Sequence, residues 1–197
     1  MRLRRLRRSE LPGDTVALAR WLLGKRVVRE LHGQRLSGRI VETEAYPVGD
    51  AAGHAFRGET PRNRSLFLRR GHAYVYFVYG SCFLLNVSSE GAGVGAGVLL
   101  RALEPLEGLP RMQRLRGTRR AFDLARGPGR LAEALAVDLR QDGLDLCARG
   151  PLWLADGDGA SAIGESVRIG ITRDADRVLR FYERENRHVS GPLRLRA

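Results

Sequence analysis

The sequence has 197 residues, 43% of them hydrophobic and 28% charged, which is the composition of one folded domain and excludes a disordered chain. Its 34 basic residues outnumber 22 acidic ones, and all but Lys25 are arginines, whose forked guanidinium groups suit a polyanionic partner. Two cysteines, four histidines without metal-ligand spacing and no apolar run of about 18 residues argue against a disulfide framework, a metal centre and a membrane span, so we expect a cytoplasmic protein.

A basic N-terminal arm, residues 1–10, opens the chain with five arginines. A charge run of this kind is usually a solvated, partly disordered tail, and contact with a nucleic-acid backbone is the alternative interpretation. Asp14 then stands where it can cap a helix over residues 14–23, which Gly24 would end. We expect this helix to be scaffold.

Two strands follow at residues 27–31 and 36–46, and His32-Gly33 between them fits the tight turn of a hairpin. The period of two in the second strand places four side chains on one face: Ile40, Glu42, Glu44 and Tyr46. Paired glutamates on a strand are usually solvated. Here a tyrosine shares their face and a histidine and several arginines follow closely, and this mixture indicates a functional site.

Residues 47–72 are rich in Gly, Pro, Arg and Asn and show little periodicity. They predict a long ordered loop, and such loops often carry functional residues. Within the loop, Arg57 precedes Thr60-Pro61-Arg62-Asn63-Arg64, where two cations flank an asparagine. This composition suits contacts with phosphates and sugars, although a capped turn before a short helix explains it equally well.

Three further strand candidates lie at residues 74–78, 83–87 and 98–103. In the first, alternation places Tyr74, Tyr76 and Val78 on one face and Val75, Phe77 and Tyr79 on the other. Aromatic residues in strands are usually core, which is what we expect for Tyr74 and Phe77. Tyr79 precedes Gly80 at a predicted hairpin tip, where an exposed ring is able to enter a base stack.

Arg101 interrupts the otherwise apolar strand at residues 98–103. Burying its charge without a partner would cost several kcal/mol, so a carboxylate such as Glu44 or Glu104 is expected close by. The resulting ion pair is either structural or part of a catalytic site.

The rest of the chain predicts helices near residues 109–115 and 129–137 and closing strands at 168–172 and 179–182. There is no internal repeat, no low-complexity linker and no break in composition. We therefore expect residues 1–197 to form a single compact α+β domain, with a mostly antiparallel curved β-sheet, short helices and a protruding β-hairpin.

These segments together resemble the alkyladenine (3-methyladenine) DNA glycosylase family. The resemblance covers nearly the whole chain, and it is carried, in order, by Arg39-Ile40-Val41-Glu42-Thr43-Glu44-Ala45-Tyr46, Thr60-Pro61-Arg62-Asn63-Arg64, Tyr74-Val75-Tyr76 with Tyr79-Gly80, Asn86-Val87-Ser88-Ser89, Val98-Leu99-Leu100-Arg101-Ala102-Leu103-Glu104-Pro105, Gly127-Pro128-Gly129-Arg130-Leu131 and Leu179-Arg180-Phe181-Tyr182.

The resemblance implies that Glu44 is the general base that activates water, and that Arg101 and the backbone carbonyl of Ile169 position this water. It implies a pocket in which a flipped base is held by Tyr46, His54 and Tyr76. Asn86 would stand where the 2-amino group of normal guanine clashes, and Tyr79 would enter the duplex in place of the flipped nucleotide.

The same resemblance implies a monomeric, monofunctional enzyme that needs no cofactor and acts on double-stranded DNA containing damaged purines. The purines are 3-methyladenine, 7-methylguanine, hypoxanthine and ethenoadenine, and the product is an abasic site. The residues expected at the DNA backbone are Arg57, Arg62, Asn63 and Arg64.

Two other hypotheses use the same residues differently. A non-catalytic nucleic-acid-binding protein would keep the basic face and the aromatic residues. Glu44 separates these readings, because a carboxylate near phosphates repels the ligand, whereas hydrolysis requires one. A glycosylase with lyase activity needs an amine nucleophile, and Lys25, which lies outside every motif, is a poor candidate.

Overall fold

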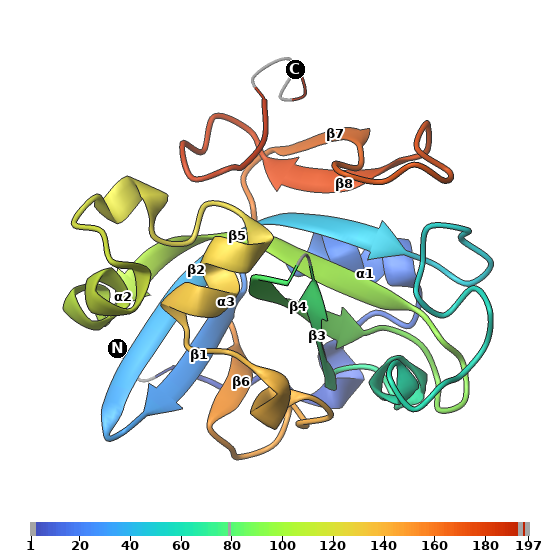
Figure 1. The fold of residues 1–197 in the computed structure, drawn as a ribbon, viewed down its shortest axis with the longest axis horizontal. Helices are drawn as coiled ribbons and strands as arrows, with labels where there is room; N and C mark the ends of the chain where they lie inside the picture. The colour runs from blue at the N-terminus through green and yellow to red at the C-terminus, as the bar shows by residue number, and fades with distance from the viewer. Residues whose placement is uncertain (1–2, 79, 193–194, 196–197) are drawn as a thin grey trace.

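Across residues 3–78, 80–192 and 195, which the computed structural model describes, eight strands form one curved antiparallel sheet with short helices around it (Figure 1). The helices are α1 (Thr15–Trp21), α2 (Leu109–Arg116) and α3 (Pro128–Ala134), with single 3-10 turns η1 (Arg8–Glu10), η2 (Arg64–Phe67), η3 (Ala121–Asp123) and η4 (Leu139–Gln141). The strands are β1 (Arg26–Leu31), β2 (Gln34–Tyr46), β3 (Ala73–Val78), β4 (Cys82–Ser88), β5 (Gly97–Glu107), β6 (Leu152–Ala155), β7 (Ile163–Val167) and β8 (Val178–Glu183).

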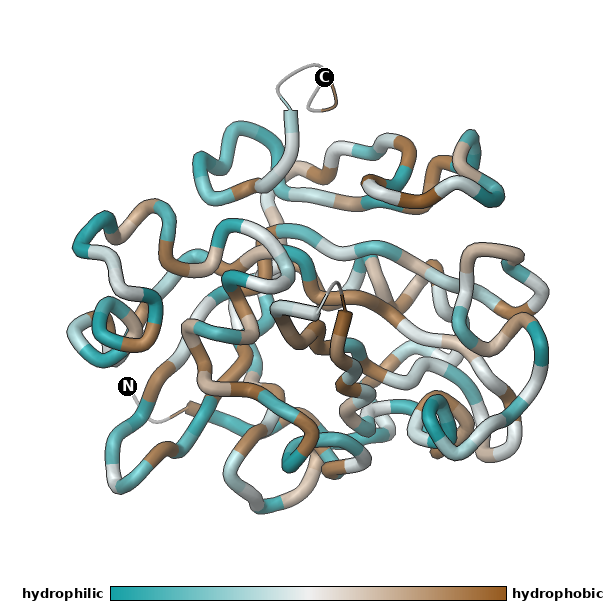
Figure 2. Tube along the Cα trace, viewed as in Figure 1, coloured by the Kyte–Doolittle hydropathy of each residue, from teal (hydrophilic) through white to brown (hydrophobic). Residues whose placement is uncertain are grey.

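The strand order is β3-β4-β5-β2-β1-β6, and the hairpin β7–β8 joins the sheet through β8, which pairs with β2. This topology confirms the predicted α+β fold with an antiparallel sheet. Figure 2 shows hydrophobic residues gathered along the central strands and hydrophilic ones along the outer loops. No helix in the described part of the chain is long and apolar enough to cross a membrane.

Local sequence signals explain the first elements. The Asp14 carboxylate accepts a hydrogen bond of 2.7 Å from the amide of Ala17, so it caps α1 as predicted. His32 and Gly33 both have positive φ, 48° and 74°, which is the geometry of a two-residue hairpin turn. The β1–β2 hairpin is therefore confirmed.

Strand β2 contains a β-bulge that the sequence pattern did not predict. Its register with β5 shifts between Ile40 and Glu42. Because one extra residue inverts the alternation, Ile40 faces the main core and does not share a face with the two glutamates. Val41 packs in a separate small cluster. Glu42 and Glu44 do share a side, since both contact Arg101.

The N-terminal arm corrects a second expectation, because its described part is not a loose tail. Arg5 forms a β-bridge with Ala155, and the amide of Leu6 donates to the carbonyl of Leu154 at 3.0 Å. Leu6 is fully buried. The buried leucine and the backbone pairing together fix the arm against β6, a strand that the sequence pattern did not reveal.

The closing strands differ in part from the prediction. β8 lies where a strand was expected at 179–182, but its hairpin partner β7 ends at Val167, so the expected strand at 168–172 is wrong. Gly170 in this segment has a φ of 79°, a left-handed conformation that interrupts an extended strand. α3 also ends before residue 137, because Ala136 adopts a positive φ of 48°.

Candidate active site

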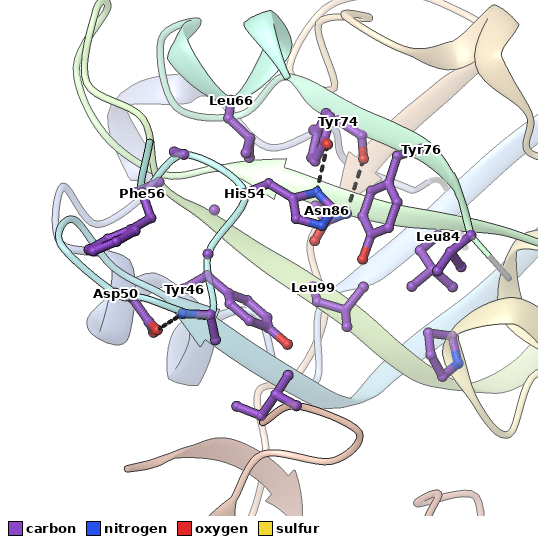
Figure 3. Close-up of a pocket in the computed structure, with 18 of the residues that line it drawn as sticks. Tyr46, Asp50, His54, Phe56, Leu66, Tyr74, Tyr76, Leu84, Asn86 and Leu99 are labelled. Atoms are coloured by element: carbon purple, nitrogen blue, oxygen red, sulfur yellow. Dashed lines mark hydrogen bonds between the residues drawn. The ribbon is translucent and has the colours of Figure 1, made fainter. Parts of the chain in front are cut away.

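A cavity of about 390 Å³ opens between the end of β2, the loop after it and the β3–β4 hairpin (Figure 3). This volume lies in the usual range for pockets that enclose a small organic group. Tyr46 lies across the pocket from His54 and Tyr76, and Asn86 lies beside these two residues. The structure thus brings together the four residues expected to hold a base.

Glu44 lies directly behind the pocket surface and is fully buried. Its carboxylate accepts hydrogen bonds from the Tyr46 hydroxyl at 3.0 Å and from the Ile169 amide at 2.8 Å. The Arg101 guanidinium lies 3.1 Å from the same carboxylate. The three residues that hold Glu44 all line the pocket. Ile169 approaches Glu44 through its amide, so the expected role of its carbonyl stays a prediction.

Arg101 confirms the expectation that a buried guanidinium needs a carboxylate. Its Nε lies 3.0 Å from Glu42 and its Nη1 3.1 Å from Glu44, whereas Glu104 lies 3.9 Å from Arg39 instead. Burial alone would lower the pKa of Arg101, but the two glutamates outweigh it and raise the pKa. A fixed positive charge therefore stands at the pocket wall beside Glu44.

Glu42 has a different environment although it lies two residues from Glu44. It pairs with Arg101 and with Arg180 at 2.7 Å, and it accepts from the Ser190 amide at 2.6 Å. Burial opposes ionisation, but the two guanidinium groups outweigh it, and the pKa of Glu42 is lowered. Glu42 connects β2, β5, β8 and the C-terminal segment, which is a structural arrangement.

Aromatic rings form one wall of the pocket. The His54 and Tyr76 ring centroids are 4.4 Å apart, and the Tyr74 ring stacks on Tyr76 at 5.3 Å. His54 Nδ1 shares a hydrogen bond of 2.8 Å with the Tyr74 hydroxyl. Desolvation and the nearby Arg62 charge lower the pKa of His54, which favours a neutral imidazole at neutral pH.

Tyr74 and Phe77 of β3 were both expected in the core, but they differ in burial. Tyr74 is buried, as predicted, yet it also lines the pocket and holds His54. Phe77 is 43% exposed and packs on Phe83 with a centroid separation of 5.0 Å, so its assignment to the core is wrong. The last residues of β3 extend beyond the core, so the face of the strand that carries Phe77 is exposed there. Tyr79, expected to enter the duplex, lies outside the described residues.

Asn63 organises the loop in front of the pocket. Its amide nitrogen donates to the carbonyls of His54 at 2.8 Å and Gly58 at 3.0 Å, and its oxygen accepts from the Thr60 amide at 2.6 Å. This is the capped-turn arrangement considered from the sequence. The oxygen and the nitrogen of the Asn63 side chain both form hydrogen bonds within the loop. These bonds do not support a DNA contact by Asn63, which stays a prediction.

The three loop arginines that we expect at the DNA backbone separate in space. Arg57 and Arg62 line a second hollow of about 440 Å³ together with Arg173, and this hollow shares His54 and Tyr74 with the pocket. Arg62 also donates to the carbonyl of Phe77 at 3.2 Å. Arg64 lies at a different hollow beside Glu59 and Asp142. Arg57, Arg62 and Arg173 are therefore the better placed cations near the pocket.

Sequence reasoning missed two buried residues beside the site, Arg168 and Asp50. They form an ion pair in which both side chains are fully buried, and the guanidinium carbon of Arg168 lies 4.6 Å from the centre of the Tyr46 ring. Arg168 was placed in a strand that does not exist, and Gly49-Asp50 reads as an ordinary turn. Among the described residues, no three His, Cys, Asp or Glu side chains gather closely enough to hold a metal ion.

A buried, hydrogen-bonded carboxylate behind an aromatic pocket, in an arginine-rich domain, is the arrangement of a hydrolase that binds a planar group of a polyanion. The chain belongs to the methylpurine-DNA glycosylase (MPG) family, which it matches over residues 9–187. Its activity is that of a DNA-3-methyladenine glycosylase, a hydrolase of N-glycosyl bonds in the base excision repair of alkylated bases. This result confirms the resemblance and decides against the non-catalytic binding protein.

Relatives of similar length support this assignment. A protein of Mesorhizobium japonicum is 67% identical over 189 residues, which cover 95% of this chain and 91% of the relative. A protein of Paraburkholderia phytofirmans is 51% identical over 191 residues, covering 96% and 90%. A protein of Carboxydothermus hydrogenoformans is 42% identical over 179 residues, covering 90% and 94%. All three carry the name "Putative 3-methyladenine DNA glycosylase".

Proposed function

We propose that this glycosylase flips a damaged purine out of double-stranded DNA into the aromatic pocket and hydrolyses its N-glycosidic bond with Glu44 as the general base. The proposed substrates are 3-methyladenine, 7-methylguanine, hypoxanthine and ethenoadenine. The enzyme works as a monomer without a cofactor and leaves an intact abasic site. The observation that carries the proposal is the buried Glu44 carboxylate, which Tyr46, Arg101 and Ile169 hold against the pocket.

The chemistry follows from the charge that develops during the reaction. As the bond from C1′ to the base nitrogen breaks, its electron pair leaves with the base and positive charge builds on the sugar. A carboxylate nearby stabilises this charge. Water attacks C1′, Glu44 accepts one of its protons, and the sugar keeps the hydroxyl. Cationic 3-methyladenine and 7-methylguanine leave as neutral bases and need no proton from the protein. Neutral hypoxanthine and ethenoadenine need a proton or a hydrogen bond at the leaving nitrogen.

Access to Glu44 requires one local movement, because the carboxylate is fully buried. The Tyr46 hydroxyl both lines the pocket and occupies one carboxylate oxygen. We infer that the attacking water reaches Glu44 by replacing this hydroxyl. Arg101 stays in place on the other oxygen, Oε1, and keeps the carboxylate oriented.

Selection of the base would rest on the other pocket residues. A base between Tyr46 on one side and His54 and Tyr76 on the other would be held by stacking, which is worth about 1–3 kcal/mol per base. The Asn86 amide is buried and held by the Tyr74 carbonyl at 3.2 Å, so it cannot easily move away from an extra amino group. This supports its proposed role in rejecting normal guanine.

Glu44→Gln tests the proposal. The variant should bind lesion-containing duplex normally but excise the base at least about 100-fold more slowly, because positioned acid-base catalysis contributes about 10² to 10⁴. Single-turnover excision from defined oligonucleotides is the measurement. Glu165→Gln, which changes an exposed glutamate on β7, is the matched control and should be fully active. Near-normal excision by Glu44→Gln would reject Glu44 as the base.

The abasic product is tested in the same reactions. Strand cleavage should appear only after alkali or heat, and borohydride should trap no covalent complex. A trapped complex would instead reveal an amine nucleophile and a lyase step.

A further inference from the structure

The ring of Tyr46 is held from behind by a buried cation. The Arg168 guanidinium carbon lies 4.6 Å from the ring centre, and its side chain is fully buried. Tyr46 lines the pocket, whereas Arg168 does not. One face of the ring therefore rests on the guanidinium, which is a favourable cation–π arrangement in a dry environment.

Arg168 is itself fixed by three parts of the chain. It donates to the Ala45 carbonyl at 3.0 Å, to the Asp50 carboxylate at 3.0 Å and to the Asp174 carbonyl at 3.2 Å. Asp174 in turn accepts from the amide of Ala51 at 2.9 Å. The end of β2, the loop after it and the segment after β7 thus meet at one guanidinium.

The next residue holds the other functional side chain of β2. The Ile169 amide donates to Glu44 at 2.8 Å, while Arg168 supports Tyr46, two residues along the same strand. Arg168 and Ile169 are neighbours in a segment outside the sheet. They hold Tyr46 and Glu44, which lie two residues apart at the pocket end of β2. An ion pair needed only for stability would not require this match.

We propose that Arg168 is a positioning residue of the glycosylase, which acts through the Tyr46 ring and holds it as the platform for the flipped base. The proposal rests on the role of Tyr46 in the proposed function. With the guanidinium behind it, the ring is already in place when the base arrives, so less of the binding free energy is spent on ordering it. Arg168 touches neither the base nor the reacting atoms in this scheme.

A double-mutant cycle tests whether Arg168 acts through the ring. The double substitution Arg168→Met with Asp50→Asn removes both charges of the pair, and the Asn oxygen still accepts from the Ala52 amide, which Asp50 holds at 2.9 Å. This change is made in the wild-type chain and in Tyr46→Ala and Tyr46→Phe backgrounds. The readout is single-turnover release of 3-methyladenine from methylated DNA, with thermal melting to confirm folding.

We expect the pair removal to slow release about tenfold in the wild-type and Tyr46→Phe backgrounds, and less than about twofold in Tyr46→Ala, since residues acting through one another are non-additive. Arg168→Lys keeps a cation beside Asp50 and should lose about threefold with the same dependence on the ring, which keeps the test available if the double substitution does not fold.

The control removes a partly buried ion pair between β2 and β8, Arg39→Met with Glu183→Gln, whose side chains meet at 2.7 Å and do not line the pocket. Its effect should be the same in all three backgrounds. An equal loss on pair removal in the wild-type and Tyr46→Ala backgrounds overturns the proposal, because Arg168 would then be only structural. If Tyr46→Ala alone leaves release unchanged, the platform role of Tyr46 in the proposed function fails, and the inference fails with it.

Discussion

Glu42 and Glu44 both contact Arg101, but their remaining partners assign them different tasks. Glu42 is fully buried between Arg101 and Arg180. Glu42→Gln should therefore destabilise the fold by about 3 kcal/mol, since breaking a buried ion pair leaves a charge without its partner. Excision per folded molecule should fall far less than in Glu44→Gln. Chemical denaturation combined with active-site titration measures both, and equal catalytic losses would mean that the two carboxylates act as a unit.

The Tyr46 hydroxyl gives a second prediction at the scale of one residue. If water replaces this hydroxyl at Glu44, the hydroxyl is not needed for hydrolysis, so Tyr46→Phe should keep excision within about threefold, well below the 10²-fold or more of a positioned acid-base group. Tyr46→Ala should lose much more, because stacking is lost with the ring. Single-turnover rates on one defined lesion compare the two variants. A 100-fold loss in Tyr46→Phe would show that the hydroxyl takes part in the chemistry.

Among the elements, the β3–β4 hairpin carries the predicted wedge. Tyr79→Ser should weaken base flipping about tenfold, because stacking of an aromatic side chain with bases is lost. The loss should be largest for well-paired lesions, whose extrusion costs most. Excision of one well-paired and one mismatched lesion, measured beside thermal stability, tests this prediction.

Phe77→Ser is the matched control on the same hairpin. Phe77 is 43% exposed and packs on Phe83, so its loss should lower stability slightly and leave the preference among lesions unchanged. The wedge hypothesis would be rejected if Tyr79→Ser lost stability and its excision fell by the same factor for every lesion.

Short-range patterns predicted the elements well and long-range pairing poorly. The cap at Asp14 and the turn at His32-Gly33 need only neighbouring residues, and both are confirmed. The bulge at Val41 depends on how β5 and β8 meet β2, which no local period records. The arm residues form a basic run along the sequence, and their packing on β6 rests on one buried leucine and on backbone pairing with distant residues.

The same distinction applies to the site. Its pocket residues lie in segments with a strong local character: an acidic strand, an aromatic strand and a glycine-rich loop. Arg168 and Asp50 carry no such signal, because their pairing joins residues 118 positions apart. The charge of Arg101 predicted a carboxylate partner, and Glu44 is one of two. The need to pair a buried charge thus predicted the contact between Arg101 and Glu44, which the periodicity of the strands did not predict.

For the whole molecule, the net charge of +12 should make DNA binding strongly dependent on salt. Arg57 and Arg173 are exposed beside the pocket. Each substitution to Gln should lower the slope of log affinity against log salt by about 0.9 if that side chain contacts one phosphate. Fluorescence anisotropy with undamaged duplex at several salt concentrations measures the slope. Arg149→Gln, an exposed arginine elsewhere, should leave it unchanged, and an unchanged slope in the Arg57 and Arg173 variants would remove them from the interface.

Two histidines should make stability depend on pH below the usual histidine pKa. Desolvation is the main cause that lowers the pKa of both His54 and His188 in the folded chain. Below about pH 6.5 the unfolded chain therefore binds protons that the folded chain does not, and the free energy of unfolding falls as the pH falls. Melting between pH 7.5 and 5.5 should show this decrease, and the double variant His54→Gln, His188→Gln should flatten it. An equal decrease in that variant would assign the effect to other groups.

The arm along β6 also bears on how the molecule behaves among copies of itself. β6 ends the strand order of the sheet, and its free side is covered by the arm through the Arg5–Ala155 bridge and the bond from Leu6 to Leu154. An open edge of this kind offers unpaired amides and carbonyls to any other strand, which is a common route to aggregation. The described part of the arm, residues 3–10, thus covers an open sheet edge, and its removal should make the protein more prone to aggregate.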